Sequence, residues 1–208
     1  MRSTTIAIPQ RLSVLLFTLC ISLPCAAEKT DAVAVIDGLH STLIAIMRDA
    51  KALGFEGRRE RIAPVVERSF DLPFIAQFTL GRHWSELNPG QQKLMVDVFS
   101  RLTIANYAAR FNNFSGEQFQ TLANDPARKG RELVRTVLKV DNDPANNVTL
   151  DYLLHETEQG WRIINVIANG VSDLSLKRAD YSAVMKSGGF DSLIAKLNDQ
   201  IKDLESKR

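Results

Sequence analysis

Apolar residues recur every three or four positions near the start of the chain, which is the spacing of one helix face. The pattern runs from residue 31 to residue 53, and Gly54 and Gly57 follow it. We therefore expect an amphipathic helix over 31–53 that ends at these glycines, and a second, shorter helix over 58–68. The apolar positions of the first helix are Val35, Leu39, Leu43, Ile46 and Met47.

Two further helices begin at an Asp or Asn that is closely followed by proline. Such side chains cap free backbone N–H groups, and proline suits the first helical turn. Asp71 with Pro73 predicts one start, and Asn88 with Pro89 predicts a helix that continues to about residue 112. The apolar positions of these two helices are Phe74, Ile75, Phe78 and Leu80, then Leu94, Met95, Val98, Phe99, Leu102, Tyr107 and Phe111.

After residue 112 the apolar period changes from about 3.6 to 2, which indicates strands. We expect a short strand over 118–122, then strands over 133–140, 148–154 and 161–168, separated by turn-forming residues. The consecutive turns favour an antiparallel meander of four strands. The last strand is apolar on both faces, which predicts a central place in the sheet.

Two helices complete the chain after Asn169-Gly170, one over 172–186 and one after Gly188-Gly189. The order of elements predicts an α+β fold in which helices cover one face of a curved, four-stranded antiparallel sheet, with an N-terminal helical part. No repeat or low-complexity segment divides the chain, so a single domain over 28–208 is expected.

The first 27 residues have the three parts of a secretory signal peptide. Arg2 and Arg11 are their only charges, residues 12–23 are apolar or small, and Ala27 ends a small-residue cleavage site. The apolar run is too short for a hydrocarbon core that takes about 20 residues. We expect cleavage after Ala27; an uncleaved anchor is the alternative, and Pro24 argues against a lipoprotein signal.

Removal of this segment changes the composition. Both cysteines, Cys20 and Cys25, lie within it, so the remaining 208 − 27 = 181 residues have none and depend on their apolar core for stability. The chain has 26 basic and 24 acidic residues; without Arg2 and Arg11, 24 of each remain. The charge therefore gives no argument for a nucleic-acid partner.

Residue patterns typical of catalysis or metal binding are missing from the sequence. His40, His83 and His155 lie more than 40 residues apart, so no metal or cofactor is predicted. The sequence has no Gly-x-Ser-x-Gly elbow and no glycine-rich phosphate loop. Ser172 follows a strand, but a helix N-cap explains it better than a nucleophile. We expect no catalytic residue and no enzyme activity.

Large apolar side chains are abundant between residues 74 and 119, and periodicity alone leaves open whether they fill a core or line a cavity. We expect a cavity between the sheet and the helices of residues 71–112. Its predicted lining residues come from both layers and are Phe74, Phe78, Phe99, Leu102, Val137, Leu150, Tyr152, Ile163 and Val184. Asp151 and His155 should point away from it, since they alternate with the inward positions.

Three stretches of the chain together resemble the toluene-tolerance family of MlaC-like periplasmic lipid carriers. The first comprises FDLPFIA at 70–76, LGRHW at 80–84 and LNPGQQ at 87–92; the second is GWRIINVIANGVS at 160–172; the third comprises YSAVMK at 181–186 and GFDSLI at 189–194. Asn165 and Asn169 depart from the acidic residues that many members have. The segments 107–111 and 114–119 look more like the branch associated with hopanoid biosynthesis.

The resemblance implies an NTF2-like or cystatin-like α+β fold with a deep apolar cavity. It also implies a periplasmic carrier that moves phospholipid or a hopanoid-type lipid between an inner-membrane ABC-transporter complex and an outer-membrane complex. Two alternatives stay open: a small-molecule enzyme, such as an isomerase, on an NTF2-like scaffold, and an interaction module with a solid core. An ionisable residue inside the cavity would favour the enzyme.

Overall fold

The computed structural model describes residues 31–140 and 143–206. The predicted signal peptide and its cleavage site lie outside the described residues, as do residues 141–142 of a predicted turn. The helices are α1 (Ala32–Arg48), α2 (Ala50–Ser69), α3 (Leu72–Leu80), η1 (Gly81–Glu86), α4 (Pro89–Arg110), η2 (Pro144–Asn146) and α5 (Asp173–Ser206). The strands are β1 (Gln118–Ala127), β2 (Arg131–Lys139), β3 (Val148–Thr157), β4 (Gly160–Ala168) and β5 (Val171–Ser172).

The helix predicted over 31–53 is divided at Asp49, where α1 ends and α2 begins. Neither glycine terminates a helix as predicted. Gly54 adopts a positive φ of 58° and bends α2, which then continues through Gly57 to Ser69. A glycine without a Cβ can take this left-handed conformation at little cost, so it redirects the helix here instead of ending it.

Arg58, just beyond this bend, is buried although its charge suggests a solvated position. Its guanidinium donates hydrogen bonds to the carbonyl oxygens of Ala108, at 2.8 Å, and Ala50, at 3.0 Å. These carbonyls belong to the end of α4 and the start of α2. The buried cation therefore joins two helices through backbone acceptors.

Both predicted helix starts are confirmed. The Asp71 carboxylate accepts a hydrogen bond from the Phe74 N–H at 3.0 Å and begins α3. Asn88 and Gln91 form a capping box, in which each side chain accepts from the other residue's backbone N–H. The sequence rule works at these two sites because the required interactions span only three residues.

The strands form the predicted antiparallel meander, in the order β1-β2-β3-β4-β5. The fifth strand has only two residues, so the four long strands are those that were expected. Strand β1 continues to Ala127, five residues beyond its predicted end at Leu122. A bulge at Leu122 shifts the alternation, and Pro126 is tolerated because β1 is an edge strand. Because of these two features, the second half of this strand lacks the regular pattern by which a strand is recognised in the sequence.

The expected central place of β4 is wrong: β4 is second to last and pairs with β5 only through Ile167 and Ala168. Further along its free edge, Ile163 forms an isolated parallel bridge with Phe70. Ile163 and Ile164 are both buried, at a point where the β3–β4 register shifts. The two apolar faces of β4 therefore arise from a bulge and from helices packed against the strand. They do not indicate a central strand with a long neighbour at each edge.

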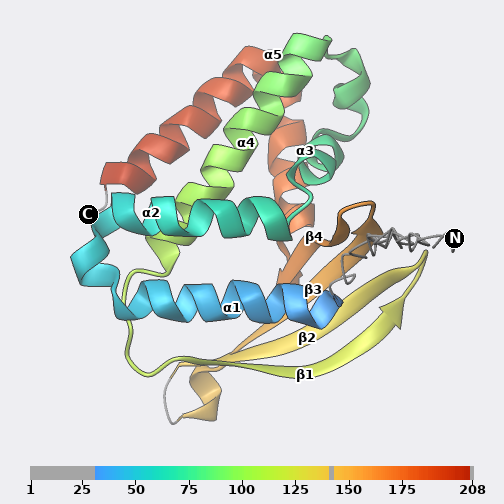
Figure 1. The fold of residues 1–208 in the computed structure, drawn as a ribbon. Coiled ribbons are helices and arrows are strands. Elements are labelled where there is room, and N and C mark those ends of the chain that lie inside the picture. Colours follow the sequence, from blue (N-terminus) through green and yellow to red (C-terminus); the bar gives the residue numbers. More distant parts are fainter. Residues whose placement is uncertain (1–30, 141–142, 207–208) are drawn as a thin grey trace, which may run out of the picture.

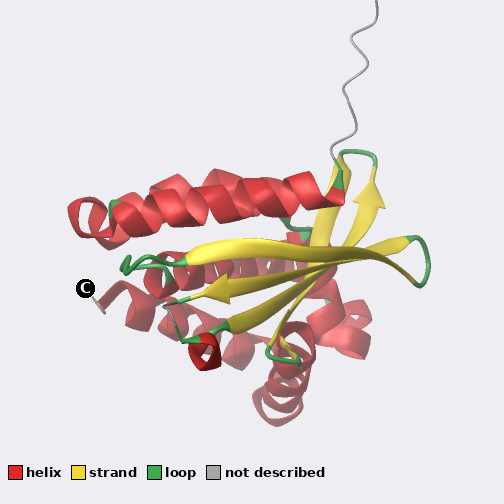
Figure 2. Cartoon of the chain, turned by 90° about the horizontal axis from the view of Figure 1, so that it is seen from below, coloured by secondary structure: helices red, strands yellow, loops and turns green. Residues whose placement is uncertain are grey.

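The helices lie mainly on one side of the sheet, as predicted (Figure 1). The view from below shows the strands in front of most of the helices (Figure 2). Helices α1 and α2 run side by side, and α3, α4 and α5 pack together farther from β1 (Figure 1). The main apolar core joins these helices to the inner face of the sheet.

Candidate functional site

The interface between the sheet and the helices brings together four of the nine residues predicted to line a cavity. Phe99 and Leu102 from α4, Tyr152 from β3 and Ile163 from β4 are all at least 97% buried and belong to one core. Their own side chains fill the space between the two layers.

The other predicted lining residues are more scattered. Leu150 and Val184 are half-buried and pack against this core from β3 and α5. Val137 is buried on the face of β2 opposite Val134, because successive strand residues point to opposite faces. Phe74 and Phe78 lie together on α3, with ring centroids 6.2 Å apart, and Phe78 is 38% exposed.

Two hollows in the described part of the chain are open depressions at the surface. One has a volume of about 280 Å³ and the other about 240 Å³. The first is lined by Phe74, Gln77, Phe78, Gly81 and Arg178, and the second by Met47, Arg48, Ala50, Lys51, Asn112, Asn113 and Phe114. Neither is lined by the four core residues above, so a cavity at the helix–sheet interface stays a prediction.

His40 is a polar residue of this interface that sequence analysis did not place there. It projects from α1 and is only 5% exposed. Its Nε2 forms a hydrogen bond of 3.0 Å with the Tyr152 hydroxyl, and its ring stacks on Phe119 with centroids 3.9 Å apart. His40 lies one position from Leu39 on the apolar face of α1, and that periodicity was the available signal.

Burial controls the charge of this polar pair. Loss of hydration lowers the pKa of His40 from 6.5 to about 4, so the imidazole is neutral at neutral pH. Burial, followed by repulsion from Tyr107, raises the pKa of Tyr152 well above 10. The pair is therefore an uncharged hydrogen bond between the first helix and the third strand.

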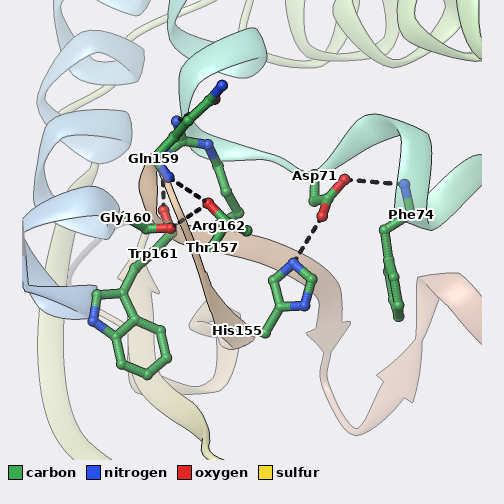
Figure 3. Close-up of polar contacts among 8 residues, drawn as sticks. All are labelled: Asp71, Phe74, His155, Thr157, Gln159, Gly160, Trp161 and Arg162. Carbon is green, nitrogen blue, oxygen red and sulfur yellow. Dashed lines mark hydrogen bonds and ion pairs between the residues drawn. The ribbon is translucent and has the colours of Figure 1, made fainter.

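A second polar pair joins the start of α3 to β3 (Figure 3). His155 Nε2 lies 2.8 Å from an Asp71 carboxylate oxygen, while the other oxygen caps α3 at Phe74. The Asp71 N–H also donates to the Ile163 carbonyl oxygen at 3.0 Å. His155 alternates with Tyr152 along β3, but it contacts Asp71 and its ring centroid lies 5.1 Å from that of Phe74, so its predicted orientation away from the helices of residues 71–112 is not borne out.

The remaining polar candidates have structural partners. His83 Nδ1 lies 2.9 Å from Glu86 Oε2. Ser172 Oγ accepts a hydrogen bond from the Ser175 N–H at 3.2 Å and donates one to Asn165 Oδ1 at 3.1 Å, which confirms it as the N-cap of α5. Within residues 31–140 and 143–206, no three His, Cys, Asp or Glu side chains are placed to hold a metal ion.

No helix in the described ranges combines the length and apolar character needed to cross a bilayer.

Comparison with a solved structure supports the fold. The structure of a phospholipid-binding protein from Ralstonia solanacearum, in complex with a phospholipid, superposes with a TM-score of 0.73 at 22% sequence identity. The match covers 84% of this chain and 99% of the other. At this identity the likeness establishes a common architecture, which is the predicted antiparallel sheet packed against helices.

The family assignment comes from the sequence match. Residues 38–199 match the MlaC protein family, and this range contains all three stretches that carry the resemblance noted above. It also extends from α1 into the second half of α5, so it spans the whole sheet. The chain belongs to the MlaC family.

Proposed function

We propose that this chain is a periplasmic lipid-binding carrier without enzymatic activity. It takes phospholipid, or a hopanoid-type lipid, between an inner-membrane ABC-transporter complex and an outer-membrane complex. The observation that carries the proposal is the family match over residues 38–199. The Ralstonia solanacearum protein of the same architecture, which binds a phospholipid, adds support.

The apolar interface between the sheet and the helices is the proposed site of the acyl chains. Leu150 and Val184 border it, while Tyr152 and Ile163 lie deeper. These side chains pack against each other in the structure, so lipid entry requires the two layers to separate. The single backbone bond of Asp71 to Ile163 and its side-chain bond to His155 then mark a point where the layers stay joined.

The energetics suit a carrier that keeps its cargo. Burial of one methylene is worth about 0.8 kcal/mol, so a sixteen-carbon chain contributes roughly 12 kcal/mol when fully enclosed. Two chains give on the order of 24 kcal/mol before costs, above the practical affinity limit of about 18–21 kcal/mol. Spontaneous release into water is then negligible, so transfer needs a partner complex that opens the protein or offers an equally apolar path.

An enzyme on this scaffold would need a reactive group that substrate can reach. The ionisable pair at the interface, His40 and Tyr152, is buried, mutually hydrogen-bonded and neutral at neutral pH. The nearby acid Asp151 alternates to the opposite face. These features favour binding over catalysis.

Lipid analysis tests the proposal directly. Protein purified from its own periplasm should carry lipid that native mass spectrometry detects and solvent extraction identifies. Leu150→Asn should lose bound lipid while retaining a cooperative melt, since its polar group can meet water at the edge of the interface. Ile163→Asn is the matched control: this side chain is fully buried, and an unpartnered amide there should destabilise the domain by several kcal/mol. Wild-type protein that never co-purifies with lipid would refute the carrier function.

A further inference from the structure

An open, largely apolar depression lies between α3 and the start of α5, outside the helix–sheet interface. Phe74 and Phe78 supply its aromatic surface, and Gln77, Gly81 and Arg178 complete its lining. Its volume of about 280 Å³ is large enough for a small polar group with an apolar neighbour. The exposure of Phe78 leaves an aromatic ring available for contact.

Arg178 is held at this depression without an acidic partner. Its guanidinium lies 4.8 Å from the Phe78 ring centroid, which is favourable for a cation–π contact. It also lies against Gly81, where an added Cβ would come within 3.1 Å of Arg178 Nη2. Among the described residues no carboxylate forms an ion pair with Arg178, and because it is exposed its positive charge is open to an external anion.

A second cationic group adjoins the same aromatic surface. Arg131 lies 6.0 Å from the Phe74 ring centroid, and it pairs across the sheet with His155, which in turn pairs with Arg162. The carboxylate near this row, Asp71, is bonded to His155. Neither Arg131 nor Arg178 has an ion-pair partner in the described part of the chain. Arg131 therefore places a second positive charge beside the Phe74 ring.

We propose that this surface binds the phosphate of an anionic amphiphile. Arg178 binds the phosphate, because a guanidinium donates well-directed hydrogen bonds to phosphate oxygens. Arg131 lies at the other end of the aromatic pair, outside the lining of the depression, and adds only to the local positive charge. Phe74 and Phe78 contact the adjoining apolar part of the molecule. The choice of a lipid headgroup over free phosphate rests on the proposed carrier function, but the surface lies outside the interface proposed for acyl chains.

Titration with three soluble probes tests the site. The ¹⁵N-labelled protein is titrated with dihexanoylphosphatidylglycerol below its micelle concentration, with dihexanoylglycerol, which lacks phosphate, and with inorganic phosphate. The Gly81 amide signal reports occupancy of the depression. We expect the phosphate-bearing lipid to shift this signal and to bind at least about tenfold more tightly than either other probe.

Variants separate the two contacts. Arg178→Gln should weaken binding of the phosphate-bearing lipid about tenfold or more, and Arg178→Lys should weaken it less. Arg101→Gln is the matched control, because Arg101 is exposed on α4, hydrogen-bonded to Asn198, and lines no part of the depression. Unchanged affinity in Arg178→Gln, equally tight dihexanoylglycerol or equally tight inorganic phosphate would each overturn the proposal. Lipid co-purification is scored separately, so a failure here is distinct from a failure of the carrier function.

Discussion

Removal of one hydroxyl group tests whether the His40–Tyr152 hydrogen bond stabilises the helix–sheet interface. Tyr152→Phe keeps the ring, which is 2% exposed, but leaves His40 Nε2 buried without its partner at 3.0 Å. A buried polar group that loses its only partner costs about 1–3 kcal/mol. For a domain of this size each kcal/mol lowers the melting temperature by about 2–4 °C, so the expected fall is about 2–12 °C.

A double-mutant cycle shows whether the loss comes from this bond. In a His40→Leu background the imidazole is gone, so Tyr152→Phe should cost at least about 1 kcal/mol less than it does in the wild type. Tyr181→Phe is the matched control, because that buried tyrosine makes no side-chain hydrogen bond among the described residues. Chemical denaturation of the four cycle members gives the free energies of unfolding. An equal cost of Tyr152→Phe in both backgrounds would refute the reasoning.

Three further predictions concern pH, the α5 cap and processing. The folded pKa of His40, about 4, is below its ordinary value of 6.5, so as the pH falls the unfolded chain binds this proton before the folded chain does. Between pH 6.5 and 4 the free energy of unfolding should therefore fall by up to roughly 3 kcal/mol more in the wild type than in His40→Leu. Parallel pH profiles of the two proteins would contradict this. Ser172→Ala should cost about 1 kcal/mol by removing the cap and leave lipid content unchanged, whereas lost lipid with intact folding would indicate a role beyond capping. Intact-mass measurement of the periplasmic protein should show a chain that starts at Glu28, and a mass that includes Cys20 and Cys25 would rule out the cleavage.

The parts of the fold that depend on short-range chemistry were predictable. The caps at Asp71, Asn88 and Ser172 each need partners only three residues away, and the meander follows from consecutive turns. The bend at Gly54 and the position of β4 were not, because they depend on how distant elements pack. A glycine has the same identity whether it ends a helix or turns it.

The candidate site, like the fold, could be predicted only in part. Apolar periodicity singled out Phe99, Tyr152 and Ile163, which are buried in the core between the layers, while their role as cavity lining stays a prediction. It did not separate Phe74 and Phe78, which face an open depression, since an apolar residue has the same spacing in a core and at a surface. Tyr152, the hydrogen-bond partner of His40, lies 112 residues away, so no local sequence pattern predicts this bond.

The meander has a consequence for the order in which the molecule assembles. Each strand pairs with its sequence neighbour, so every hairpin closes a short loop and forms early. The contacts of α1 and α3 with β3 instead span 112 and 84 residues. During vectorial synthesis α1 and α3 therefore emerge with their apolar faces uncovered, and most of the chain must follow before the sheet can shield them. The helix–sheet interface, which is proposed to receive the acyl chains, is thus also the surface left longest exposed to chaperones and proteases during folding.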